Sequence, residues 1–124
     1  MKWLGNILWL IFGGLIISVE YLIASILLMI TIIGIPFGLQ TLKLAGLALW
    51  PFGNEVKPGA SEGNLLSVIM NVFWILVGGF WIAITHLIFG ALLAITIIGL
   101  PFAMQHFKLA ALALTPFGKE ISTI

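Results

Sequence analysis

The stretch Ile30-Thr-Ile-Ile-Gly-Ile-Pro-Phe37 decides how this chain folds, because it interrupts a long apolar run and occurs twice. Proline has no N–H to donate, and it pushes the residue before it out of the α-helical region. Glycine two positions earlier tolerates the resulting bend. We therefore expect each copy, with Gly34 and Pro36 or with Gly99 and Pro101, to end one helix and begin the next.

The second copy of this stretch belongs to an internal repeat with a fixed offset of 65 residues. Aligned without gaps, residues 6–56 and 71–121 are identical at 27 of 51 positions. Leucine-rich segments match by chance, but coincident Gly, Pro, Gln, Lys and Asn residues do not. The chain therefore contains two copies of one unit. The predicted organisation is a first membrane repeat, a polar linker with its lead-in, and a second membrane repeat, at residues 1–56, 57–67 and 68–124.

The composition predicts an integral membrane protein. Of the 124 residues, 62% are hydrophobic and 7% are charged, against roughly 25% charged in a typical soluble domain. The run from Leu4 to Ile33 contains one charged residue, Glu20, and the run from Leu65 to Leu100 contains none but includes His86. A bilayer core of about 30 Å takes about 20 helical residues, so each run is long enough to span it.

We predict an all-α membrane protein in which each repeat is a long helix plus a shorter helix, broken at Gly-x-Pro. The long arms are Leu4–Ile33 and Val68–Ile98, and the short arms are Phe37–Trp50 and Phe102–Thr115. Two topologies fit this pattern. In the first, each repeat crosses the bilayer twice and turns near Glu20-Tyr21 or Thr85-His86. In the second, the long arm crosses once and the short arm lies in the interface.

Lysine placement favours the double crossing. Both termini, the linker and all the lysines then share one face of the membrane. The lysines are Lys2, Lys43, Lys57, Lys108 and Lys119. The positive-inside rule assigns that face to the cytoplasm. The length of the short arm favours the other topology, because roughly 14 helical residues rise only about 21 Å. We favour the double crossing, with the termini and the linker cytoplasmic.

The chain contains two runs of Ile-Ile-Gly-[Ile/Leu]-Pro-Phe, and each is followed by the pattern K-L-A-x-L-A-L-x-P-F-G, at residues 43–53 and 108–118. With these motifs the chain resembles the YccF family of bacterial inner-membrane proteins. The first copy adds the ending Pro51-Phe-Gly-Asn-Glu55. The resemblance covers essentially the whole chain. It implies a small inner-membrane protein with the domain in tandem, usually described as having four membrane segments. It implies no activity and no catalytic or binding residues, because the biochemical role of the family is not established.

Glu20 and His86 are candidate functional residues, because ionisable groups within membrane segments are costly and usually have a partner or a purpose. Glu20 is either a proton or cation site or a solvated residue in a hairpin loop. His86 is either a pH sensor that relays protons with Glu20 or an interfacial ring. His106 is expected to face lipid headgroups. No metal ligation is expected.

Gln40 and Lys43 recur as Gln105 and Lys108, and the spacing of three places each pair on one helix face. Such faces either line an aqueous path or hold a lipid phosphate, or the lysines simply extend along apolar surface to reach water. We favour the last interpretation.

No motif typical of an enzyme occurs, and we expect no catalytic role and no cofactor. A net charge of +1 gives no reason to expect nucleic acid as a partner. The favoured function is a structural or accessory component of the inner membrane, which contacts the lipid bilayer and acts through self-assembly as a homo-oligomer or through other membrane proteins. The alternative is an oligomeric channel or transport module in which the repeated Gly-x-Pro breaks line the path.

Overall fold

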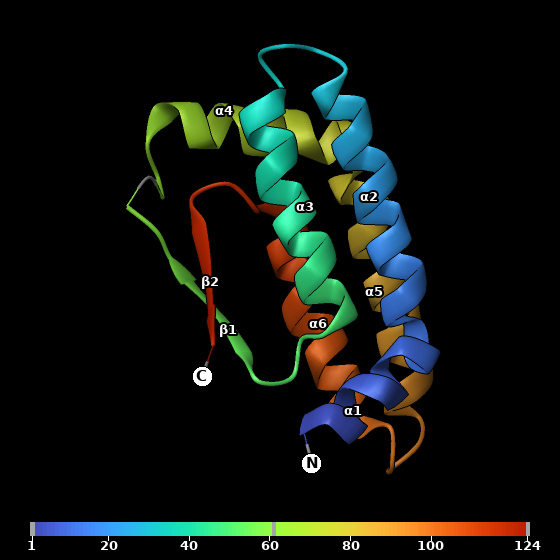
Figure 1. Cartoon of the computed structure of the whole chain (residues 1–124). Coiled ribbons are helices and arrows are strands. Elements are labelled where there is room, and N and C mark those ends of the chain that lie inside the picture. Colours follow the sequence, from blue (N-terminus) through green and yellow to red (C-terminus); the bar gives the residue numbers. More distant parts are fainter. Residues whose placement is uncertain (1, 61, 124) are drawn as a thin grey trace.

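The computed structural model describes residues 2–60 and 62–123, and Figure 1 shows their arrangement. The chain is mostly helical, with one short two-stranded ribbon. The elements in chain order are α1 (Lys2–Trp9), η1 (Leu10–Gly14), α2 (Leu15–Met29), α3 (Ile35–Leu49), β1 (Asn54–Pro58), α4 (Leu65–Trp74), η2 (Ile75–Gly79), α5 (Phe80–Ala94), α6 (Leu100–Leu114) and β2 (Lys119–Thr123), where η denotes a π-helical segment.

Each repeat folds into an antiparallel helical hairpin, α2 with α3 and α5 with α6 (Figure 1). The Gly-x-Pro break forms the hairpin turn, so the predicted end of one helix and start of the next are confirmed. In the first turn, the Thr31 hydroxyl donates to Leu28 O at 3.0 Å and accepts from Gly34 N at 3.1 Å. Thr96 repeats both bonds in the second turn. The hydroxyl thus satisfies backbone groups that the helix ends leave free.

The long arm of each repeat bends at a pair of glycines. In Figure 1, α1 and α4 run across the ends of the hairpin helices rather than continuing their line. The π-helical segment η1 contains Gly13 with φ of +120°, a conformation that favours glycine. Gly14 is buried under the indole of Trp9, and Gly79 under that of Trp74. The double glycine therefore lets a bulky ring fold back over the bend.

The turns predicted near Glu20-Tyr21 and Thr85-His86 are wrong. Both sites lie in the middle of 15-residue helices, α2 and α5. The polar residues there do not interrupt the helix, because Glu20 and Thr85 bond to each other across the repeats and His86 is buried in the core.

The segment after each hairpin is extended, which the sequence pattern did not predict. Strands β1 and β2 pair antiparallel, with Asn54 opposite Thr123 and Pro58 opposite Lys119. Each strand is entered through a Pro-Phe-Gly turn in which Gly53 or Gly118 has φ above +90°. The linker of the first repeat and the tail of the second therefore form one ribbon beside α3 and α6 (Figure 1).

The two repeats are related by a pseudo-two-fold axis that lies across the helices. Val56 pairs with Ile121, its own counterpart at the offset of 65 residues. Glu20 and Thr85 are also counterparts, and they are joined by a hydrogen bond. The hairpins consequently point in opposite directions, with the turn of the first at the upper end of Figure 1 and that of the second at the lower end.

The core contains equivalent contacts from both repeats. The buried Trp9 indole donates to Ala48 O at 2.6 Å, and the buried Trp74 indole donates to Ala113 O at 2.9 Å. Asn6 exchanges two hydrogen bonds with the backbone of Phe52, at 2.9 and 2.8 Å. Asn71 does the same with Phe117. These bonds attach each N-terminal helix to the turn that begins the following strand.

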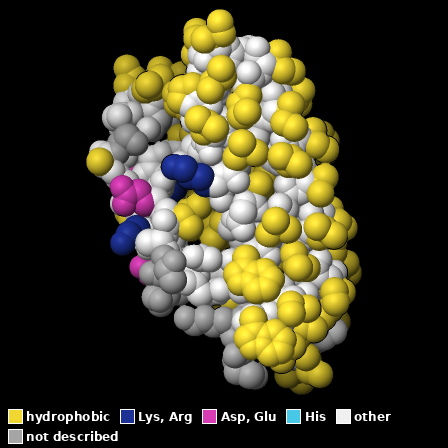
Figure 2. Space-filling model, in the orientation of Figure 1, with side chains coloured by type: hydrophobic (Ala, Val, Ile, Leu, Met, Phe, Trp, Pro, Cys, Tyr) yellow, Lys and Arg dark blue, Asp and Glu magenta, His cyan; other side chains and the backbone are white. Residues whose placement is uncertain are grey.

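The surface divides into an apolar part and a charged part. Figure 2 shows hydrophobic side chains along the side formed by α2, and lysine and acidic side chains on the side of the ribbon. The hairpin turns belong to the apolar part: Ile32, Ile33, Ile97 and Ile98 are 80–86% exposed. Chain loops in water rarely expose such residues together, so these turns are suited to contact with lipid.

Candidate functional site

The four residues of the Gly-x-Pro breaks lie at the hairpin turns. Pro36 and Pro101 occupy the first turns of α3 and α6, where the N–H that proline lacks would have had no helical partner. Gly34 has no room for a side chain, because a Cβ there would collide with Leu28 O. A Cβ on Gly99 would likewise lie only 2.5 Å from Leu93 O. The two breaks lie at opposite ends of the molecule and do not approach each other (Figure 1).

Glu20 lies between α2 and α5 at the centre of the apolar side. Its Oε2 accepts a hydrogen bond from Thr85 Oγ1 at 2.9 Å. Its Oε1 is buried and has no hydrogen-bond partner within residues 2–60 and 62–123. A groove of about 170 Å³ adjoins the carboxyl group. The residue is therefore neither in a hairpin loop nor fully solvated.

His86 is fully buried and its partner is His106 rather than Glu20. The two Nδ1 atoms lie 2.9 Å apart. The expectations of an interfacial ring at His86 and of a headgroup-facing His106 are therefore wrong, since both side chains have no exposed surface. Position 106 faces inward because it lies on the side of α6 that packs against α5.

The hydrogen bonds fix the tautomers of a neutral histidine pair. His106 Nε2 lies 2.8 Å from Phe12 O, which can only accept, so this nitrogen carries the proton. His106 Nδ1 is then an acceptor, and His86 Nδ1–H donates to it. The remaining nitrogen, His86 Nε2, is a buried acceptor without a partner in the described part of the chain. The two hydrogen bonds therefore run in one direction, from His86 to His106 and from His106 to Phe12 O, and His86 Nε2 at the start keeps an unpaired lone pair.

Aromatic rings enclose the histidine pair. The Trp9 ring centroid lies 4.1 Å from that of His106, and Phe89 stacks on His106 at 5.6 Å. On the other side, His86 and Tyr21 border an internal gap too narrow for a water molecule. In the first repeat the counterparts are Tyr21 and Thr41, with no histidine. The pair is thus a property of the second repeat alone.

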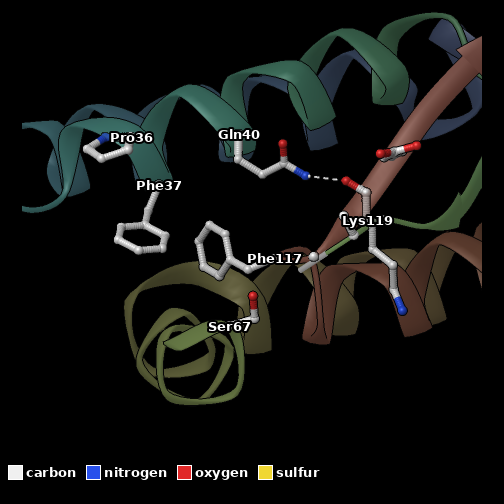
Figure 3. Close-up of a pocket in the computed structure, with 10 residues that line it drawn as sticks. Pro36, Phe37, Gln40, Ser67, Phe117 and Lys119 are labelled. Carbon is white, nitrogen blue, oxygen red and sulfur yellow. Dashed lines mark hydrogen bonds between the residues drawn. The ribbon is translucent and has the colours of Figure 1, made fainter. Parts of the chain in front are cut away.

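Gln40 connects the first hairpin to the ribbon. Its Nε2 donates to Pro116 O at 3.1 Å and to Lys119 O at 3.0 Å. Figure 3 shows the bond to Lys119. Lys43, one turn further along α3, is exposed and borders a cleft with Lys119 and Glu120. In the second repeat Gln105 is half-buried and Lys108 is exposed. Gln40 therefore has a structural contact, whereas both lysines reach the surface.

A surface groove of about 340 Å³ lies between α3, the start of α4 and the ribbon (Figure 3). Phe37 and Phe117 meet edge to face at one end, with ring centroids 5.2 Å apart. The other end is polar, and there Lys119 Nζ forms an ion pair with Glu62 at 3.1 Å. The groove combines apolar and charged walls, which suits a partner that is itself amphipathic.

The part of the chain that the structure describes brings together no set of side chains large enough to form a typical metal site. No group of three or more His, Cys, Asp or Glu side chains gathers among residues 2–60 and 62–123. His86 and His106 supply two nitrogens, but structural metal sites usually need four ligands. The geometry of the pair is that of a hydrogen bond between two imidazoles.

The comparisons with known proteins agree with the repeat and with the apolar segments. The family model YccF, described as an inner membrane component domain, matches residues 4–54 and 69–119. The chain is 30% identical, over 133 aligned positions, to "Inner membrane protein YccF" of Escherichia coli (strain K12) and of Shigella flexneri. The alignment covers 100% of this chain and 89% of each relative. No solved structure matches the chain.

Two segments of the structure, Trp3–Met29 and Leu65–Ala94, have the length and apolar composition of membrane spans, at 27 and 30 residues. Each family match contains most of one such segment. The repeat, the membrane-length segments and the two matched domains together identify the family: the chain belongs to the YccF family of inner-membrane proteins, with its domain in two copies.

Proposed function

We propose that this protein is a structural or accessory component of the inner membrane, without catalytic activity, that acts on partner proteins or on other copies of itself through its charged ribbon face. By this name we mean β1, β2 and the exposed residues Lys43, Lys57, Glu55 and Glu120 beside or within them. The observation that carries the proposal is the separation of this face from an otherwise apolar surface.

The ribbon face is proposed to lie on the cytoplasmic side. The linker and the tail are paired strands, so they must share one side of the membrane. The lysines of the linker, the tail and α3 lie on or beside the ribbon, in agreement with the positive-inside rule. The side chain of Lys2, which the sequence pattern also places on this face, lies outside the described part of the structure.

The hairpins are proposed to lie within the bilayer with their helices parallel to the membrane plane. The pseudo-two-fold axis, which lies across the helices, then runs along the membrane normal. The two hairpins point in opposite directions, so helices that stood upright in the membrane would place the two hairpin turns on opposite sides of the bilayer. With the helices in the membrane plane, both hairpins present the same side to water. Each hairpin helix has 15 residues, a rise of about 22 Å, against a bilayer core of about 30 Å. With the axis in the membrane plane, Glu55, Lys57 and Glu120 would enter hydrocarbon, at roughly 3 kcal/mol each.

A photo-crosslinking amino acid in place of Lys57 tests the proposal in cells. The expected result is a discrete protein adduct: one of twice the chain mass identifies self-assembly, and one of another mass identifies a different partner. The same substitution at Leu22, exposed on α2, is the matched control and should give no protein adduct. Absence of an adduct at position 57, or the same adduct at both positions, would contradict the proposal.

A transport module is the second candidate, and the inverted relation of the two repeats favours it. Many transporters place their substrate site at the interface of inverted repeats, and here Glu20 and Thr85 meet at that interface. This function requires the axis to lie in the membrane plane and the ribbon face to be covered by other copies. Cysteine labelling of the two hairpin turns separates the two orientations.

A further inference from the structure

The groove beside Glu20 is open to the apolar side of the molecule. It lies between α2, η2 and α5, has a volume of about 170 Å³, and is lined by Glu20 together with Ile23, Ala24, Val77, Trp81 and Ile82. The helices approach closely at its floor, where a Cβ on Gly78 would lie 2.7 Å from that of Ala24. A ligand would therefore reach this groove from the lipid phase.

The carboxyl group is only half satisfied. Thr85 Oγ1 donates to Oε2, while Oε1 is buried without a partner among residues 2–60 and 62–123. The residues that line the groove include no cationic side chain. An isolated carboxylate in apolar surroundings is strongly disfavoured unless a positive charge or several donors reach it. The groove lining thus contains one carboxylate side chain and no positively charged side chain to pair with it.

We propose that this groove binds an organic ammonium cation with an apolar body, whose charge is paired with Glu20. The apolar walls would cover the body of the ligand, and the side chain of Trp81, which is 63% exposed, offers an aromatic face to the cation. The carboxylate would attract the cation from the wall of the groove, while Thr85 holds Oε2 in place. Charge complementarity is therefore the basis of recognition.

An inorganic cation does not fit the same site. Calcium takes six to eight oxygen ligands and magnesium a near-octahedral set, whereas the groove lining offers one carboxyl group among apolar side chains. A quaternary or alkylated ammonium group is weakly hydrated and needs no such set. The apolar walls that exclude a metal ion favour an organic cation.

Equilibrium dialysis of radiolabelled benzyltrimethylammonium against the full chain in nanodiscs of zwitterionic lipid tests this inference. We expect saturable binding of one cation per chain above the level of empty nanodiscs. The Glu20→Gln variant keeps the shape and the acceptor for Thr85, and it should bind at least ten-fold more weakly. Glu55→Gln, which removes a carboxylate on the ribbon face instead, should bind like the unmodified chain.

A second arm uses the unmodified chain alone and so does not depend on the folding of a variant. Neopentylbenzene is the uncharged carbon isostere of benzyltrimethylammonium, and it should not displace the bound cation at equal concentration. Equal binding to Glu20→Gln and to the unmodified chain would overturn the inference, because apolar contact alone would then explain the affinity. Displacement by the uncharged isostere, or no saturable binding, would overturn it as well.

Discussion

Val56 pairs with Ile121 in the ribbon, and these residues occupy the same position in the two repeats. A strand position that pairs with its own counterpart must lie on the axis that relates the repeats. The hydrogen bond between Glu20 and Thr85 marks the same axis on the opposite side of the helices. The axis therefore runs from the charged ribbon face to the apolar side of α2 and α5, which gives the molecule a charged pole and an apolar pole.

The tautomers of the histidine pair are a first prediction. His106 should carry its proton on Nε2, because that nitrogen donates to Phe12 O, and His86 should carry its proton on Nδ1. Nitrogen-15 NMR of histidine-labelled protein in lipid measures both assignments directly. Assignment of the resonances with His86→Gln and His106→Gln serves as the control. A His106 protonated on Nδ1 alone would contradict the geometry.

The asparagine at the start of each repeat gives a second prediction. Asn6→Ala removes two partly buried hydrogen bonds and leaves the N–H and C=O of Phe52 unpaired, so it should lower the free energy of unfolding by about 2–3 kcal/mol. Urea unfolding in detergent micelles measures this loss. Asn54→Ala is the matched control, because its bond to Trp50 O is exposed, and it should change stability by no more than about 0.5 kcal/mol. Equal effects would show that the buried bonds contribute no more than the exposed one.

The glycine at the second bend gives a third prediction. A Cβ on Gly79 would lie 2.7 Å from both Ala113 O and the ring of Trp74, so Gly79→Ala should destabilise the fold by about 1–3 kcal/mol. Gly46→Ala is the control, because a Cβ there meets nothing within 4 Å. In the interior of α3 that substitution should stabilise the fold by about 0.5–1 kcal/mol. The same unfolding assay compares the two variants, and a stabilising Gly79→Ala would contradict the close packing at the bend.

The sequence predicts the repeat, the two arms of each repeat and the helix boundary at Gly-x-Pro, because these depend on local residue chemistry. A Gly-x-Pro sequence such as Gly34 to Pro36 ends one helix and starts the next in any apolar run of this kind. The threonine inside the same motif supplies the turn with its own hydrogen-bond partners. Local motifs of this kind are readable without knowledge of tertiary contacts.

The sequence does not predict contacts that depend on how helices pack. His86 and His106 meet only because α5 and α6 form a hairpin whose register brings them together. Glu20 and Thr85 look like a loop position in a hydropathy pattern, yet they bond to each other in mid-helix. The pairing of β1 with β2 requires the pseudo-two-fold axis, which a repeat alone does not orient. A search for polar residues shared or exchanged between repeat counterparts would have singled out Glu20 and Thr85.

The orientation of this axis in the membrane is the central claim, and cysteine labelling tests it most directly because the chain contains no cysteine. Thr31→Cys and Thr96→Cys place a thiol in each hairpin turn, and Ser122→Cys places one in the ribbon. Each variant is treated with an impermeant maleimide in intact and in permeabilised cells, and labelling after denaturation controls for expression. We predict that position 122 reacts only after permeabilisation and that neither turn reacts in either condition. Labelling of one turn from outside and of the other only after permeabilisation would place the axis in the membrane plane and contradict the account.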